Sequence, residues 1–153
     1  MKRLFFAVGL GLWVLLSGCS EPGQTYQSKS GFTLQLPAHW LVKDKPGFAL
    51  FALPESLSPL NITLEVHPGV RGMNAEDYLE TVLLRAQALS GAHYQIQKLP
   101  AQIIGANSAQ RARVTYPFEG QRMRFDLLVA MNANKAYVLR AGGPEALYAP
   151  QAK

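Results

Sequence analysis

The sequence predicts an α+β domain in which an amphipathic helix lies on an antiparallel β-sheet. Apolar and polar residues alternate in several short segments, as at residues 32–36 and 61–67, and a period of two is typical of strands with one buried face. One stretch, residues 74–91, has apolar residues at helical spacing instead,. A two-residue turn at Glu119-Gly120 separates two strand-like segments, and such a turn favours antiparallel pairing,.

The first strand is expected at residues 32–36 (FTLQL), where Pro37 ends it because proline has no backbone N–H to donate,. Residues 40–42 are expected to form a short partner strand. Residues 48–53 are continuously apolar, which predicts a strand covered on both faces,. In residues 61–67 (NITLEVH) the alternation turns Ile62, Leu64 and Val66 inward. Together these segments predict an antiparallel meander.

The helix is expected to begin after Asn74, a favourable N-cap residue, with Asp77 stabilising the first turn,. Gly91 is a suitable residue for its end,. Leu84 is the one apolar residue that lies outside the expected buried sector. The residues of that sector are Ala75, Tyr78, Leu79, Val82, Leu83, Ala86 and Leu89. This pattern predicts a helix packed on a sheet, not a membrane or cofactor segment.

Four further strands are expected, at residues 94–99, 110–118, 121–131 and 136–141. The Glu119-Gly120 turn sets the register of the second and third of them, with Gly120 supplying the positive φ that the turn needs,. The pairs expected on the core face are Tyr116 with Met123, Val114 with Phe125, and Ala112 with Leu127. The pairs expected on the other face are Arg113 with Asp126, and Thr115 with Arg124. If the next loop, near residues 132–134, has an odd length, Arg140 also lies beside Asp126.

Arginines gather on the predicted non-core face of these strands. They are Arg111, Arg113, Arg122, Arg124 and Arg140, and only Asp126 and Glu119 offset them. Guanidinium groups suit carboxylates and phosphates, so this face is a candidate surface for an anion or an acidic partner. The alternative is a solvated or covered face, where the arginines pair locally and protect the sheet from edge pairing.

The N-terminus has the pattern of an export signal. Lys2 and Arg3 precede an apolar run from Leu4 to Leu16, whose length of about 13 residues suits a signal-peptide core better than a transmembrane helix. Residues 16–19 (LSGC) then resemble a bacterial lipobox, in which the cysteine thiol accepts a diacylglyceryl group. We therefore expect residues 1–18 to be a lipoprotein signal peptide and Cys19, the only cysteine, to be lipidated and to attach the chain to a membrane,.

The rest of the chain divides into a tether and one domain. Residues 19–30 are polar and contain Gly and Pro, which predicts a short flexible tether,. Residues 31–153 are enough for a single core. Ser20 occupies the position where aspartate would indicate retention in the inner membrane, so the outer membrane is favoured. The expected location is thus the cell envelope, with the domain in the periplasm. With one cysteine, no disulfide forms within the chain.

Composition and motifs argue against several functions. Removing Lys2 and Arg3 lowers the basic residues from 15 to 13 against 10 acidic residues, so the net charge falls from +5 to +3. These charges are dispersed, and nucleic acid is not an expected partner. No serine-nucleophile elbow, phosphate-binding glycine loop or HExxH zinc motif occurs,. We expect no enzyme activity and no cofactor. The scattered His39, His67 and His93 leave a zinc site with Glu65 possible, but no metal site is predicted,.

Residues 31–40 (GFTLQLPAHW) resemble the opening motif of the PsbP-like superfamily, which includes Mog proteins and DcrB-type lipoproteins. Later matching segments occur in the same order, at residues 61–66, 77–79, 104–105, 109–111 and 135–139. The resemblance implies an antiparallel sheet of about six strands with helices on both faces, an α/β/α sandwich. It also implies a closing helix and last strand, whereas residues 144–148 only begin such a helix, so the domain is expected to be truncated at its C-terminus.

Members of this superfamily mostly act as binding or assembly factors. The first hypothesis is therefore a lipid-anchored, non-catalytic binding or assembly module of the cell envelope whose partner is another envelope protein. The alternative is a periplasmic receptor for a small ligand or metal ion, which would use a cavity between the sheet and the helix.

Overall fold

The computed structural model describes residues 23–28, 30–56, 58–90, 93–104 and 107–148. The predicted signal peptide, Cys19 and the first part of the predicted tether lie outside the described residues.

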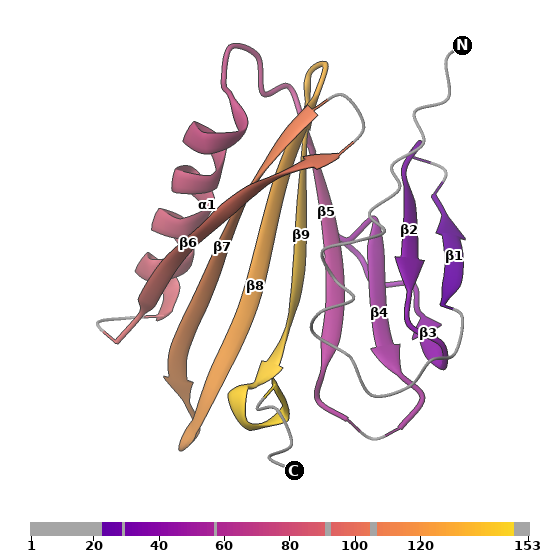
Figure 1. The fold of residues 1–153 in the computed structure, drawn as a ribbon, viewed down its shortest axis with the longest axis vertical. Coiled ribbons are helices and arrows are strands. Elements are labelled where there is room, and N and C mark those ends of the chain that lie inside the picture. The colour runs from indigo at the N-terminus through magenta and orange to yellow at the C-terminus, as the bar shows by residue number, and fades with distance from the viewer. Residues whose placement is uncertain (1–22, 29, 57, 91–92, 105–106, 149–153) are drawn as a thin grey trace.

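A seven-stranded antiparallel sheet forms the centre of the domain, with the order β3-β4-β5-β9-β8-β7-β6 (Figure 1). Its strands are β3 (Trp40–Val42), β4 (Leu50–Pro54), β5 (Asn61–Pro68), β6 (Gln95–Ile104), β7 (Asn107–Phe118), β8 (Gln121–Asn132) and β9 (Lys135–Pro144). The predicted α+β class and the antiparallel pairing are confirmed, except that residues 40–42 pair with β4 instead of with residues 32–36. One more strand is present in the sheet than the predicted number of about six.

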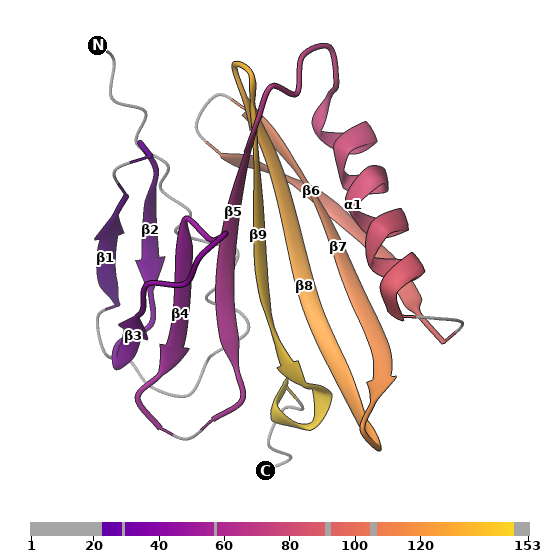
Figure 2. The same ribbon diagram turned by 180° about the vertical axis from the view of Figure 1, so that it is seen from behind.

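The helix α1 (Ala75–Ser90) packs on one face of the sheet, against β7 and β8 (Figure 2). Its start is the predicted one: the Asn74 Oδ1 accepts from the Asp77 backbone N–H at 2.9 Å, and the Asn74 amide donates back to the Asp77 carboxylate at 2.8 Å,. Leu84 is 65% exposed, as its place outside the apolar sector indicated. The predicted helix end at Gly91 lies outside the described residues.

The opposite face of the sheet carries a β-hairpin rather than a second long helix. The hairpin pairs β1 (Gln24–Gln27) with β2 (Thr33–Leu36) and is separate from the main sheet. A 3₁₀-helix, η2 (Glu145–Tyr148), follows β9 on this side. Among the described residues α1 is the one α-helix, so the helix layer expected on this face is replaced there by β1 and β2. Residues 24–27, predicted to be part of a flexible tether, instead form a strand because β2 offers them a hydrogen-bonding partner,.

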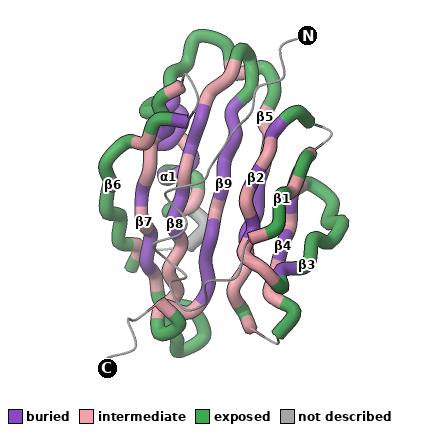
Figure 3. Tube along the Cα trace, turned by 45° about the vertical axis from the view of Figure 1, so that its right-hand side comes forward, coloured by how far each residue is buried: buried purple, intermediate pink, exposed green. Residues whose placement is uncertain are grey.

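The sheet separates two hydrophobic cores. The first lies between the sheet and α1, and includes Leu79, Leu83, Val129 and Val138. The second lies between the sheet and the hairpin, and includes Phe32, Leu36, Ile62 and Leu139. Buried residues accordingly run along β8 and β9, the middle strands (Figure 3). We call the two sides of the sheet the helix face and the hairpin face.

The β7–β8 register is the predicted one: Glu119 and Gly120 form the turn with φ of 48° and 75°, and Arg113 lies opposite Asp126,. The edge strand β6 continues to Ile104, beyond the predicted end, with a shift in its pairing to β7 between Leu99 and Gln102. Pro100 is tolerated here because an edge strand has one side without a sheet partner,.

Candidate functional site

The predicted arginine face exists in part. Arg111, Arg113, Arg122 and Arg124 share the hairpin face of β7 and β8, and we call these four residues the arginine face. Arg140 was wrongly placed with them. Asn132 pairs with Lys135, so the β8–β9 turn has two residues, and this even length puts Ala141 opposite Asp126 and Arg140 opposite Leu127 on the helix face,.

Asp126 forms ion pairs with two members of the arginine face. The Arg113 Nε donates to Asp126 Oδ1 at 2.7 Å, and the Arg124 Nη2 donates to Asp126 Oδ2 at 2.9 Å. Burial would raise the pKa of the Asp126 carboxyl, but the hydrogen bonds from Arg113 and Arg124 outweigh it and hold the pKa below its usual value,. The side chains of Asp126 and Arg124 are only 9% and 12% exposed. This cluster therefore has the geometry of a structural ion-pair network.

Arg122 is more accessible than the two arginines that bind Asp126, because 57% of its side chain is exposed. The Arg122 Nε lies 2.7 Å from the Glu145 carboxylate, and its Nη2 donates to the Gln95 side chain at 2.7 Å. Arg124 also lies over the Tyr148 ring, 4.6 Å from its centroid,. Arg111 forms no ion pair with any described residue and is half-buried. Within the arginine face, Arg111 and Arg122 are therefore the candidates for contact with a partner.

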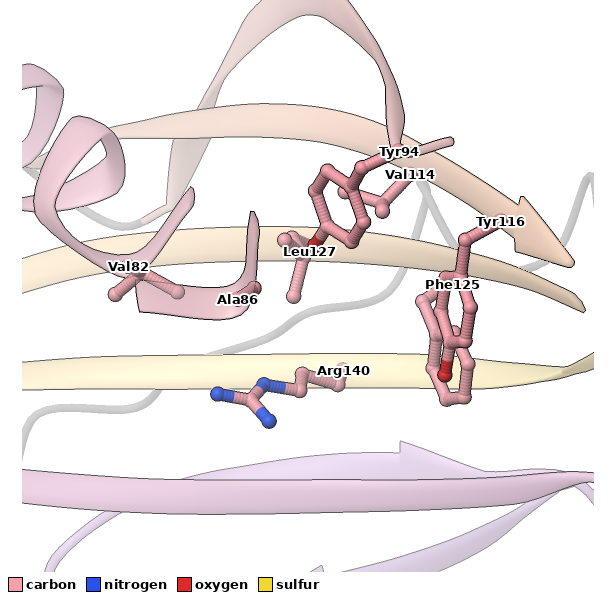
Figure 4. Close-up of a pocket in the computed structure, with 8 residues that line it drawn as sticks. All are labelled: Val82, Ala86, Tyr94, Val114, Tyr116, Phe125, Leu127 and Arg140. Carbon is pink, nitrogen blue, oxygen red and sulfur yellow. The ribbon is translucent and has the colours of Figure 1, made fainter. Parts of the chain in front are cut away.

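A pocket opens on the helix face, between α1 and strands β7, β8 and β9, with a cavity volume of about 170 Å³ (Figure 4). We call it the helix-side pocket. It is lined by Val82, Ala86, Tyr94, Val114, Tyr116, Phe125, Leu127 and Arg140. All these residues except Arg140 are apolar or aromatic. The predicted cavity between sheet and helix is therefore present. Its lining includes Arg140, which was predicted to lie on the other face of the sheet.

Three aromatic rings form one wall of this pocket. Tyr94 stacks on Tyr116 with ring centroids 5.8 Å apart, and Tyr116 stacks on Phe125 at 5.9 Å with the two planes 8° apart. Gly142 lies opposite Phe125 in the register, and a Cβ at Gly142 would come within 2.0 Å of the Phe125 ring. Glycine at this position is thus what allows the ring to lie against the sheet.

Arg140 is poorly paired for an arginine beneath a helix. Its Nη2 lies 3.4 Å from Glu65 Oε1, a long contact for a charged pair,. Its Nε is buried and has no hydrogen-bond partner among the described residues. A buried donor left in this state costs about 1–3 kcal/mol. The Arg140 side chain as a whole is 37% exposed, so the rest of the guanidinium remains open to an acceptor.

Glu65 connects Arg140 to a second pair of polar groups. Its Oε2 lies 2.9 Å from His67 Nε2, and His67 Nδ1 lies 2.5 Å from the Tyr78 hydroxyl on α1. Because a carboxylate only accepts, the neutral tautomer that fits both contacts has its proton on Nε2 and accepts from Tyr78 at Nδ1,. Burial is the main cause that raises the pKa of Tyr78. Tyr78 therefore donates in this network as a neutral phenol at physiological pH.

The histidines do not assemble a metal site in the described part of the chain. His67 contacts Glu65, as a zinc site with Glu65 would need. The other two histidines lie elsewhere: His39 Nδ1 is 3.7 Å from Glu55 Oε2, and His93 is exposed. No three side chains of the types His, Cys, Asp and Glu come together among the described residues. Within those same residues, no helix combines the length and apolar composition needed to cross a bilayer.

No protein-family model matches the chain, and no curated protein matches it in sequence. Solved structures with a similar fold include cyanobacterial PsbP (CyanoP) from Synechocystis, with a TM-score of 0.57 and 14% identity over 86% of this chain and 88% of that one. LpqN from Mycobacterium tuberculosis, described as involved in cell envelope biogenesis, has a TM-score of 0.52 and 13% identity over 80% and 72%. PA94 from Pseudomonas aeruginosa, a protein of unknown function, has a TM-score of 0.51 and 10% identity over 82% and 85%.

At these identities the likeness establishes the fold. The chain has a PsbP-like fold, as the resemblance of its sequence implied. Structural similarity at this level gives no evidence that the chain shares the partner or the activity of any of these proteins.

Proposed function

We propose that this chain is a lipid-anchored, non-catalytic binding module of the cell envelope, and that its binding site is the helix-side pocket. The observation that carries the choice of site is the incompletely paired Arg140 side chain in the lining of an otherwise apolar cavity. Ligand pockets usually combine apolar walls with a few polar groups that fix orientation, and this pocket has that composition.

The anchor part of the proposal depends on the lipobox at residues 16–19. Attachment through Cys19 would hold the domain at an envelope membrane, and Ser20 favours the outer one. The involvement of the similarly folded LpqN in cell envelope biogenesis is consistent with this location.

Metabolic labelling with a fatty-acid analogue tests the anchor. Wild-type full-length protein should take up the label and fractionate with membranes, whereas Cys19→Ser should do neither. An unlabelled wild-type protein, or a Cys19→Ser variant with unchanged processing and location, would refute the anchor.

A second candidate function, assembly with an acidic envelope protein, is favoured by the 57% exposure of the Arg122 side chain on the arginine face. Mild crosslinking in cells distinguishes the two candidates. A stoichiometric protein partner, lost in the double variant Arg111→Ala/Arg122→Ala, supports assembly. Recovery of the protein without a partner, together with thermal stabilisation by a small molecule, supports the pocket. Arg124 is unsuitable for this test because it holds Asp126.

A further inference from the structure

We propose that the helix-side pocket binds a small monocarboxylate with a single-ring apolar body, and that Arg140 holds the carboxylate. This inference rests on the proposed function, because it names the ligand class of the same site. It combines three independent properties of the pocket: an incompletely paired guanidinium, an aromatic wall and room for one ring.

The donor property separates Arg140 from Arg113, Arg122 and Arg124 on the opposite face. The Nε of Arg113 donates at 2.7 Å to Asp126, whereas the Nε of Arg140 has no partner among the described residues. The Glu65 carboxylate is divided between Arg140 and His67, and its contact to Arg140 is the longer of the two. A guanidinium fork binds a carboxylate through two parallel N–H groups, so a ligand carboxylate would satisfy the donors that Glu65 leaves unused.

The positive charge of Arg140 affects the tyrosines that line the pocket. Burial raises the pKa of Tyr94 to about 12 and raises that of Tyr116, while the positive charge of Arg140 opposes both shifts. The same charge that favours a phenolate at these positions favours a bound anion between them. A neutral ligand would gain nothing from this potential.

The wall and the volume define the body of the ligand. Tyr94, Tyr116 and Phe125 form an aromatic wall at one end of the pocket, while the Arg140 guanidinium lies toward Val82 and Ala86 (Figure 4). A planar ring stacks on such a surface better than a flexible chain does. The cavity of about 170 Å³ is close to the engineered apolar cavity of about 150 Å³ that admits benzene,. It therefore has room for one ring.

Calorimetric titration of the full-length protein in detergent tests this proposal with benzoate as the ligand. Benzoate should bind at one site per chain. Benzyl alcohol, which has the same ring without the charge, should bind at least about tenfold more weakly, since hydrogen bonds to charged groups contribute that much. Inorganic phosphate, which has charge without a ring, should also bind more weakly.

Three variants locate the site. Arg140→Met should weaken benzoate binding at least about tenfold, whereas the matched control Arg122→Met, on the opposite face, should leave it unchanged. Ala86→Phe keeps Arg140 but fills the pocket from α1, and it should abolish binding. If Arg140→Met does not fold, Ala86→Phe and the comparison with benzyl alcohol still decide the question.

The proposal is overturned if the folded wild-type protein gives no binding with benzoate, if benzyl alcohol binds equally well, or if Ala86→Phe binds like the wild type. These outcomes are separable from failure of the proposed function. Benzoate binding by a protein that is not labelled by fatty acid would retain the pocket and reject the anchor. A labelled protein that recruits a protein partner and ignores benzoate would reject the ligand class alone.

Discussion

Removal of the Asp126 charge tests whether the arginine face is a structural network. In Asp126→Asn the two guanidinium groups lose their shared carboxylate. Removing one partner of a buried ion pair typically costs about 3–5 kcal/mol. Arg113 is 30% exposed and can turn toward water, while Arg124 is 12% exposed and remains uncompensated. We therefore expect a loss near the lower end, about 3 kcal/mol of unfolding free energy.

Urea unfolding at neutral pH measures this loss. With an m-value of about 2 kcal/mol/M, the midpoint should fall by about 1.5 M while the slope stays unchanged. The control is Glu145→Gln, which removes the exposed pair with Arg122 and should cost less than about 1 kcal/mol,. If Asp126→Asn lies within about 0.5 kcal/mol of the wild type, the network contributes nothing to stability and this reasoning is wrong.

The difference in unfolding free energy between the wild type and Asp126→Asn should depend on pH in a definite direction. The pKa of Asp126 is lowered in the folded protein from an ordinary value of 3.8. Its contribution to stability is thus present above about pH 4 and is lost as the pH falls through the lowered folded pKa. The difference between wild type and Asp126→Asn should be constant near neutrality and shrink below pH 4, and a difference that grows in acid would contradict the assignment.

Three further predictions follow from single contacts. Asn74→Ala removes the N-cap of α1 and should cost about 1 kcal/mol in urea unfolding, and no change would mean that the capping hydrogen bonds are dispensable,. Gly142→Ala places a Cβ against Phe125 and should cost about 1–3 kcal/mol and weaken benzoate binding, whereas unchanged stability would show that the ring relocates freely,. Because the pKa of Tyr94 is raised to about 12 from 10.0, stability should decline as the pH rises between these values, and Tyr94→Phe should reduce the decline seen in alkaline unfolding,.

The sequence predicted the elements whose signals are local. Helix α1 was expected from its apolar spacing and the Asn74 cap, and the β7–β8 register from the Glu119-Gly120 turn. In each case a few neighbouring residues determine the geometry, so no knowledge of the remaining chain was needed.

The errors arose where distant parts of the chain decide the outcome. Strand β1 is short and largely exposed, and only its pairing with β2 makes it a strand. The position of Arg140 depends on whether the β8–β9 turn has an even or an odd number of residues. Ala133 adopts a φ of 52° in that turn. Alanine rarely has a positive φ, so its presence in the sequence does not indicate this conformation.

The helix-side pocket could not be located from the sequence because it is a packing gap shared by α1, the segment before β6 and three strands. The possible cavity between sheet and helix was anticipated, but not its lining. An arginine at a position that should face the helix is the one signal that could have pointed to it, and the wrong turn length concealed that signal.

The shift in pairing along β6 has a consequence for copies of this domain crowded together in one compartment. The outer border of the sheet exposes Ile96 and Ile103, at 41% and 71%, beside backbone groups that could recruit a further strand,. Pro100 offers no amide hydrogen, and the shift between Leu99 and Gln102 interrupts the border near its middle,. A strand of a neighbouring molecule could therefore pair only with two short segments of β6 that are out of register with each other. This arrangement discourages the growth of a continuous intermolecular sheet.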